Sequence, residues 1–592
     1  MTLLFINAKV ALRTALHLGT GDSGELTDSP ARRDAAGNIV IPGTSVAGAL
    51  RNICTRLSQR LAAYAPEKGS IYDGGYSCNA LIPNKKQSDN LPCGCPACRL
   101  FGDINPTESG GGGYKAGASK VWVYDLYPVT QCPTAFRDSV GIDRVSGAAN
   151  NKAAAKFDLE IVPAGTQFLL KMKIENTEPA EEELLCAALE EWRMGRGSLG
   201  GGSARGLGAI DLLDIEVRMW DLNDPSALMS YLRDDDPWTG GTLIAGWLEK
   251  LVEEARRRVT APPAGEECFA RGFFSFEFTL QGVGPLLTGD AVSSTRFGFD
   301  HAPLFSTLFT AEGPVLPGAG LRGVLRGQAE KILRTLAAYN AGGKRDFLHT
   351  CPACDPLARE AGGPLAGCDV LLEERGIGTE SEPEEGQLCL SCLLFGSPRQ
   401  GSRLVVEDAN ILPGDMPALK AIDFLAVDRF TGGGREGAKF DALALWKPRF
   451  RVRLRLDNPE KWELGLLTLV LRDLEEGMLR VGFGASKGFG AVTAGQWDVL
   501  AGFLTEEDLP LENAGHSWGM ERDYSGVYHC LRLEGENISS TGAWAEMAKE
   551  WLAALHERIN TFSRKFQLSE DSYFGRPEEK LYPLEVLVNV KG

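Results

Sequence analysis

The chain has 592 residues, of which 43% are apolar and 24% charged, a composition typical of a soluble globular protein with roughly two to four domains. No apolar run approaches the ~20 residues that span a bilayer, and the first residues alternate like a strand instead of forming a signal peptide. A formal net charge of −17 argues against a uniformly basic nucleic-acid-binding surface, although a local basic groove is compatible with it. We therefore expect a cytoplasmic protein without a membrane segment.

The hydrophobic pattern predicts helices separated by strands. In chain order, helical spacing of apolar residues occurs at 45–63, 179–194, 244–258, 461–478 and 543–562. Strand-like stretches include 120–126, 273–289 and 403–409. Strands that alternate with single helices favour an α+β fold with helices on one side of a mostly antiparallel sheet.

Four sequence blocks occur twice, in the same order. They are IPGTSVAGALRN (41–52) and LPGAGLRGVLRG (316–327), CPACRLFGD (from Cys95) and CLSCLLFGS (from Cys389), GIDRVSGAANNKAAAKFDLE (from Gly141) and AVDRFTGGGREGAKFDALA (from Ala426), and GSARGLGAI (from Gly202) and GASKGFGAV (from Gly484). Collinear matches indicate an internal duplication. We predict a first unit over 1–220, a linker with a helix over 221–268, a second unit over 269–500 and a C-terminal extension over 501–592.

Each unit carries a Gly-rich loop with one cation, Arg205 in the first and Lys487 in the second. Each loop follows a helix and precedes a strand, the reverse of the order in Rossmann and P-loop sites, so we exclude those folds. Glycine permits close approach of the backbone to a phosphate or to a neighbouring strand. The Pro-Gly turn before the helix near Ser45 also favours an anion at the helix N-terminus. Alternatively, each Gly-rich loop is only a tight turn, and its Arg or Lys is a solvated surface charge.

Eight of the fourteen cysteines lie in two clusters. They are Cys78, Cys93, Cys95 and Cys98 in the first unit, and Cys351, Cys354, Cys389 and Cys392 in the second. Two C-x-x-C pairs predict a closed zinc site with four thiolate ligands, in which Cys368 or His349 is an alternative ligand. Two structural zinc ions would fasten long insertions that have little core of their own.

Taken together, the repeated blocks resemble the RAMP superfamily, whose members form the backbone of type III CRISPR effector complexes. The resemblance covers both units and implies a tandem fusion of two backbone subunits, as in variant, type III-D-like systems with fused subunits. It implies two ferredoxin-like, RRM-related domains with thumb-like β-hairpins and zinc-binding insertions. A prokaryotic cytoplasm and other RAMP-type subunits of a multisubunit complex are the implied location and partners.

The resemblance also implies that the Pro-Gly turn and the Gly-rich loop hold the guide RNA (crRNA) by its backbone, while base pairing recognises a single-stranded target RNA. The implied RNA-binding residues are Ser45, Arg51, Arg144, Lys156, Arg205, Arg322, Arg326, Arg429, Lys439 and Lys487. The thumb wedge maps to Phe136, Val145 and Phe430. A hairpin that belongs to the core is the alternative.

Family members that cut target RNA carry an aspartate in the loop before the Pro-Gly turn. Asp28 and Asp300 match best, with Asp22 and Asp34 as rivals in the first loop and Asp290 in the second. An aspartate can accept the proton of a ribose 2′-OH or help to hold Mg²⁺ or another divalent cation. We therefore expect a metal-dependent endoribonuclease with one cut per unit. A non-catalytic guide-binding scaffold and a zinc protein unrelated to RNA are the alternatives.

Overall fold

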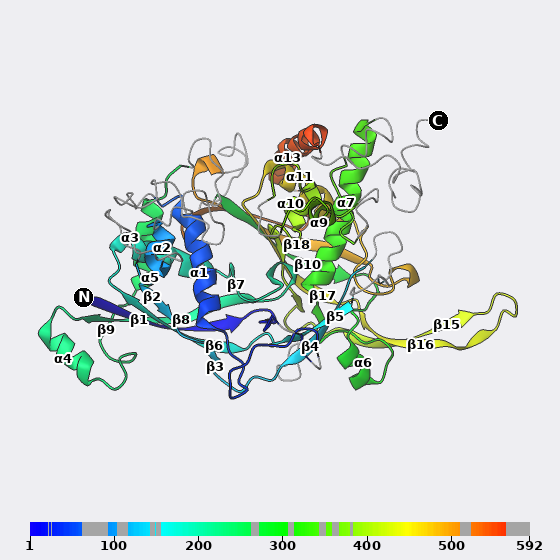
Figure 1. The fold of residues 1–592 in the computed structure, drawn as a ribbon. Coiled ribbons are helices and arrows are strands. Elements are labelled where there is room, and N and C mark those ends of the chain that lie inside the picture. The colour runs from blue at the N-terminus through cyan, green and yellow to red at the C-terminus, as the bar shows by residue number, and fades with distance from the viewer. Residues whose placement is uncertain are drawn as a thin grey trace.

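A computed structural model describes the chain over residues 1–21, 23–24, 27–61, 93–102, 117–142, 149, 156–261, 271–305, 313–341, 351–357, 366–378, 383–508, 523–540 and 542–563. These residues form two α+β units that lie side by side, with helices packed on one face of each sheet (Figure 1). Within this described part of the chain, no helix has the length and hydrophobicity that a bilayer crossing requires.

The first unit is built on a βαββαβ core. Its elements are β1 (Thr2–Leu12), α1 (Gly43–Ser58), α2 (Pro96–Phe101), β2 (Val121–Val123), β3 (Tyr127–Pro128), β4 (Ala135–Val140), β5 (Lys156–Ile161), β6 (Gln167–Glu175), α3 (Pro179–Arg193), β7 (Gly197–Ser198), the 3-10 turn η2 (Ser203–Arg205) and β8 (Ala209–Asp221). The main sheet has the antiparallel order β2-β6-β1-β8-β7, in which β1 lies between β6, which precedes α3, and β8, which follows it after the short strand β7. This is a ferredoxin-like arrangement.

The second unit repeats that plan. Its elements are β10 (Gly272–Gly282), β11 (Pro285–Leu286), α6 (Ala291–Phe297), β12 (Val315–Leu316), α7 (Gly318–Ala341), α9 (Cys368–Glu373), α10 (Leu390–Phe395), β13 (Leu404–Val406), β14 (Ala409–Ile411), β15 (Ala418–Val427), β16 (Gly434–Trp446), β17 (Arg449–Asp457), α11 (Lys461–Glu475), the 3-10 turn η3 (Ala485–Lys487) and β18 (Val492–Phe503). The antiparallel order β13-β17-β10-β18 matches β2-β6-β1-β8, and β14 pairs with β17 as β3 pairs with β6. The duplicated, mostly antiparallel α+β fold predicted from the sequence is therefore confirmed.

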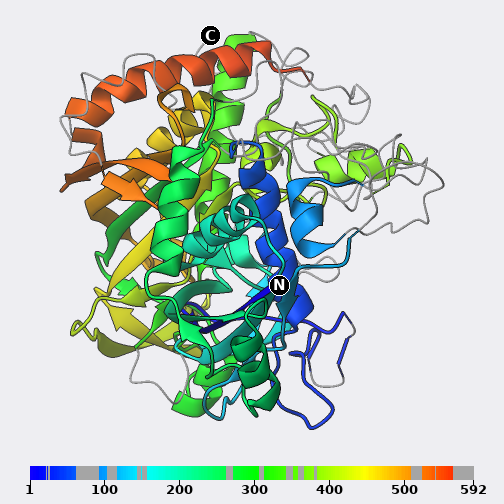
Figure 2. The same cartoon turned by 90° about the vertical axis from the view of Figure 1, so that its left-hand side faces the viewer.

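Segments outside the two predicted units complete their sheets and cores. They contain α4 (Pro225–Arg233), β9 (Thr242–Leu243), α5 (Trp247–Arg257), the 3-10 turns η4 (Glu506–Asp508) and η5 (Ile538–Ser540), β19 (Asp523–Ser525), β20 (Tyr528–Gly535) and α13 (Gly542–Thr561). The linker helix α5 packs on α3, and β9 pairs with β8. In the C-terminal extension, β20 adds to β18 while α13 packs on α11 and α7 (Figure 2).

Local sequence explains where the main elements begin and how they pack. The buried residues of α1 recur every three or four positions, at Val46, Leu50, Ile53 and Leu57, so one face of this helix covers the sheet. Each second helix, α3 and α11, begins with a glutamate capping box that satisfies its first N–H groups. The equivalent capping boxes of α3 and α11 are further evidence that the two units arose by duplication.

A hairpin projects from each unit. In the first unit it is formed by β4 and β5, and in the second by β15 and the first part of β16. The β15–β16 hairpin extends away from the rest of the molecule, whereas β4–β5 lies against the second unit (Figure 1).

Contacts that join the units in the described part of the chain include two ion pairs and a close backbone approach. Arg13 binds Glu407 with an N–O distance of 2.8 Å, and Arg137 from the β4–β5 hairpin binds Asp408. Burial raises the pKa of Asp408, while Arg137 and the N–H of Gly318 favour its charged form. A Cβ on Gly206 would lie 2.1 Å from Asp408 Oδ1 and 3.0 Å from Gly318 Cα, so only glycine fits there. The Gly-rich loop of the first unit therefore lies directly on the Pro-Gly turn of the second.

We predict that Gly206→Ala separates the units, because its methyl group has no space beside Asp408. The matched control is Gly488→Ala at the equivalent position of the second unit, where φ is +85° and, beyond the two neighbours in sequence, no atom of the described residues lies within 4 Å of the added carbon. Both changes cost about 1–2 kcal/mol for the left-handed backbone. The denaturation midpoint should fall further for Gly206→Ala, and equal midpoints would contradict the junction described here.

Candidate metal centres and RNA-binding surface

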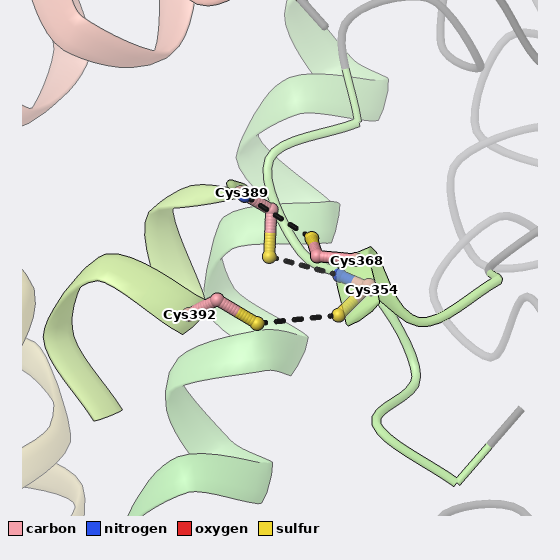
Figure 3. A group of neighbouring side chains, drawn as sticks. All are labelled: Cys354, Cys368, Cys389 and Cys392. Carbon is pink, nitrogen blue, oxygen red and sulfur yellow. Dashed lines mark hydrogen bonds between the residues drawn. The ribbon is translucent and has the colours of Figure 1, made fainter. Parts of the chain in front are cut away.

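Four buried sulfurs of the second unit form a compact cluster between α7, α9 and α10. The side chains of Cys354, Cys368, Cys389 and Cys392 point toward one another, and their sulfurs all lie within 4.8 Å of each other (Figure 3). Tetrahedral Zn–S bonds of about 2.3 Å place sulfurs about 3.8 Å apart, so the four thiols fit a zinc ion. This set corrects one predicted ligand. Cys368 takes the place expected for Cys351, which lies outside the cluster, while His349 lies outside the described residues.

Backbone N–H groups and α7 hold the cluster in place. The N–H of Cys354 donates to Cys389 Sγ at 3.4 Å, and the N–H of Cys389 donates to Cys368 Sγ at 3.3 Å (Figure 3). From α7, Arg334 donates to the carbonyl of Cys354 at 2.7 Å. Such bonds fix ligand orientation, which is what a structural metal site requires.

The first unit contains the corresponding cluster. The sulfurs of Cys93, Cys95 and Cys98 are buried and lie within 4.8 Å of one another. Its fourth predicted ligand, Cys78, lies outside the described residues. The chemistry is again that of a zinc site, because three clustered thiols leave one coordination position for a fourth ligand.

An arginine contacts the last cysteine of each cluster. Arg51 donates to Cys98 Sγ at 3.2 Å, and Arg326, at the same position of the repeat, donates to Cys392 Sγ at 3.5 Å. Arg326 is buried, with 8% of its surface exposed. Burial alone would lower its pKa, but Cys392 and Glu330 raise it overall. This corrects the expectation that Arg326 faces RNA, since its guanidinium faces a thiol.

The two predicted catalytic aspartates have the same environment in both units. Asp28 accepts a hydrogen bond from the N–H of Asp158 at 3.0 Å and donates its own N–H to Asp158 Oδ1 at 2.9 Å. Asp300 and Asp441 form the same reciprocal pair, at 2.9 and 2.8 Å. The pKa of Asp158 is lowered, chiefly by the Asp28 N–H. Each pair brings two carboxylates together at the surface, beside the middle of the paired strands of a hairpin.

The rival aspartates have local structural roles. Asp34 accepts hydrogen bonds from the N–H groups of Ala36 and Asn38 within its own turn. Asp290 is buried and caps α6 through the N–H of Ser293 at 2.7 Å. Asp22 lies outside the described residues. Among the described candidates, Asp28 and Asp300 are therefore the two that share one arrangement.

The remaining predicted RNA-binding residues divide by exposure. Those with exposed side chains are Lys156, Arg205, Arg429, Lys439 and Lys487, whereas Ser45, Arg51 and Arg322 are half-buried and Arg144 lies outside the described residues. Arg322 donates to the carbonyl of Phe395. The predicted anion site at each helix start is partly occupied, because Asp125 accepts the N–H of Gly43 and Asp408 accepts that of Gly318.

Aromatic side chains lie on both hairpins. Phe430, at the end of β15–β16, is 99% exposed, and Phe136 on β4 is 41% exposed. Val145 lies outside the described residues. The ring of Phe430 is therefore accessible to a partner at the end of the projecting hairpin.

Sequence reasoning missed four acidic residues of this surface. They are the aspartate partners Asp158 and Asp441, and the helix-start aspartates Asp125 and Asp408. The first two stand in the repeated KFD triplet, so their recurrence was a usable signal. Nothing in the sequence placed any of the four beside its partner.

Replacement of one cysteine distinguishes the two possible ligand sets. We predict that Cys368→Ser lowers the zinc content of the purified chain by one ion, because it removes one of four clustered sulfurs. Cys351→Ser is the matched control and should leave the zinc content unchanged. Elemental analysis measures both, and loss of zinc from the Cys351 variant alone would contradict the assignment.

The contact between Arg326 and Cys392 predicts a second effect. Arg326→Gln should weaken metal retention roughly 10–100-fold, as is usual for groups that support a ligand, and should leave guide-RNA affinity unchanged. Arg205→Gln should do the reverse, because Arg205 is exposed on the Gly-rich loop and no hydrogen bond to a cysteine sulfur is seen for it among the described residues. Competition with a chromogenic chelator and titration with guide RNA measure the two effects. A loss of RNA affinity with intact metal retention in Arg326→Gln would overturn this reading.

Comparison with known proteins identifies the family. A model of the RAMP superfamily matches residues 9–211 and 279–493, one match within each ferredoxin-like unit. A search of curated proteins found no significant match. Members of the superfamily are RNA-binding subunits of CRISPR-associated complexes. Because the two matches together cover more than half of the chain, the protein belongs to the RAMP superfamily and contains two of its domains in tandem.

Proposed function

We propose that the chain is a backbone subunit of a type III CRISPR effector complex that binds a guide RNA along both units. The observation that carries this proposal is the contact of the first unit's Gly-rich loop with the second unit's Pro-Gly turn. Asp408 donates its N–H to the carbonyl of Gly206 at 3.3 Å, and Gly206 lies against Gly318. The elements expected to hold the RNA backbone are thus contiguous across the junction, as one continuous strand requires.

The exposed cations and hairpins support the same proposal. Arg205 and Lys487 have exposed side chains on equivalent loops, so they can contact phosphates at a regular interval. Phe136 and Phe430 lie on equivalent hairpins and are suited to stack against bases of the duplex. Other RAMP-type subunits would continue the strand beyond the two units. The net charge of −17 is compatible with this when the cations are gathered in one groove.

We further propose that each unit cleaves the bound target RNA once. In each aspartate pair, one oxygen of Asp28 or Asp300 accepts a backbone N–H, and the other oxygen remains to accept the proton of a 2′-OH. The paired carboxylates offer the oxygen ligands that Mg²⁺ prefers, and such a cation, when bound, polarises the phosphate.

A non-catalytic scaffold is the second candidate function. It is favoured by the same reciprocal hydrogen bonds, because they give Asp28 and Asp300 a structural task that needs no chemistry. Conversion to asparagine separates the two functions. Asparagine can still accept the backbone N–H through its carbonyl oxygen, but it cannot act as a base.

We predict that Asp28→Asn and Asp300→Asn each abolish one of two cuts in a labelled target, while guide and target binding stay unchanged. The alanine variants should lose the same cut and also the hydrogen bond to Asp158 or Asp441. Denaturing gels of the products from the guide-loaded chain locate each cut. Both cuts remaining in the asparagine variants would support the scaffold.

A further inference from the structure

A cavity of about 810 Å³ lies between the hairpin of the first unit and the aspartate loop of the second. Val140 and Lys156 of β4 and β5 line it from the first unit, and Asp300, His301 and Asp441 line it from the second. The proposed second cleavage site is therefore built from both units. Its volume is in the range of cavities that enclose a small ligand, and it suffices for one nucleotide.

His301 occupies a place that a serine occupies in the first unit. Ser29 follows Asp28 and forms a parallel bridge with Leu159, and His301 follows Asp300 and forms the same bridge with Ala442. The two aspartate loops are thus equivalent position by position. The second loop differs by presenting an imidazole directly after its aspartate.

The first unit has an imidazole nearby, but its nitrogens are engaged. His17 is buried, and it binds the carbonyl of Glu160 at 2.8 Å and the hydroxyl of Ser29 at 3.0 Å. His301 is half-buried and lines the cavity, and within the described part of the chain its imidazole has no hydrogen-bond partner. This difference predicts that an imidazole can take part in proton transfer at the second site but not at the first.

Aromatic contacts hold the imidazole of His301 in a defined orientation. Its ring lies 4.6 Å from that of Phe483 and meets Phe440 edge-on at 5.8 Å. Its backbone is fixed as well, since Leu443 donates its N–H to the His301 carbonyl at 2.8 Å. Lys487 lies over the Phe440 ring at 4.6 Å. A ring that is positioned by packing and belongs to the lining of a cavity is suited to proton transfer.

We propose that His301 is the general acid of the second unit's cut, an inference that rests on the proposed function. Asp300 takes the proton of the 2′-OH, the 2′-oxygen forms a bond to phosphorus, and the bond from phosphorus to the 5′-oxygen breaks. The imidazolium of His301 gives its proton to that leaving oxygen. The products are a 2′,3′-cyclic phosphate and a 5′-hydroxyl, and one proton has moved from the imidazolium to the leaving oxygen while another has moved from the 2′-OH to Asp300. Lys156 of the first unit, which also lines the cavity, stabilises the negative charge on the phosphate.

The test uses a target RNA whose 5′-oxygen at the second cut is replaced by sulfur. A thiolate leaves without protonation, so it does not need a general acid. With the guide-loaded chain, His301→Gln should slow the second cut of the oxygen target by roughly 100-fold or more, and the sulfur target should restore the rate to within a few-fold of the wild type. The first cut, read in the same reaction, should not change.

His556→Gln is the matched control, because His556 is exposed on α13, away from the cavity. It should leave both cuts unchanged. Normal cutting of the oxygen target by His301→Gln, or equal slowing of the oxygen and sulfur targets, would overturn the role of His301. Absence of both cuts in the wild-type chain would instead overturn the proposed cleavage function, and with it this inference.

Discussion

The missing side chain at Gly206 is the constraint on which the arrangement of the two units depends. Because no Cβ occupies the space, the Gly-rich loop of the first unit rests on the Pro-Gly turn of the second, and Asp408 links both to Arg137 of the hairpin. A buried carboxylate of this kind is costly unless it is paired, so the hairpin must stay attached for Asp408 to remain charged. The junction thereby fixes the loop, the helix start and the hairpin with respect to one another.

Some side chains are the same at equivalent positions of the two units, and others differ. The shared ones indicate common structure, whereas the different ones indicate a function of one unit. The reciprocal aspartate pairs and the arginine contacts to cysteine sulfur recur in both units. By contrast, Ser29 is replaced by His301, and the serine at position 139 of the first hairpin corresponds to Phe424 on the second, where Phe424 stacks on Phe440 at 4.6 Å. The conserved features belong to the scaffold and the proposed common reaction, whereas the changed ones surround one site.

Much of the fold could be predicted from the sequence, because the patterns that specify it are local. The helix expected at 179–194 is α3, Pro179–Arg193, and the one expected at 244–258 contains α5, Trp247–Arg257. The clustering of Cys354 with the pair Cys389 and Cys392 was also predictable. The identity of the fourth ligand was not, because Cys368 reaches the cluster through a long insertion whose path no spacing rule describes. Likewise, Arg326 has the sequence context of a surface cation, and only the packing of α10 against α7 shows that it contacts Cys392.

The central claim is that the two units hold a single RNA strand that passes the junction without a break. Photocrosslinking from residue 205 and, separately, from residue 487 to guide RNA tests it most directly. The two equivalent loops should crosslink to different nucleotides of one guide molecule, separated by a constant interval in guides of different sequence. Crosslinks to the same nucleotide from both positions, or from only one of them, would contradict the account.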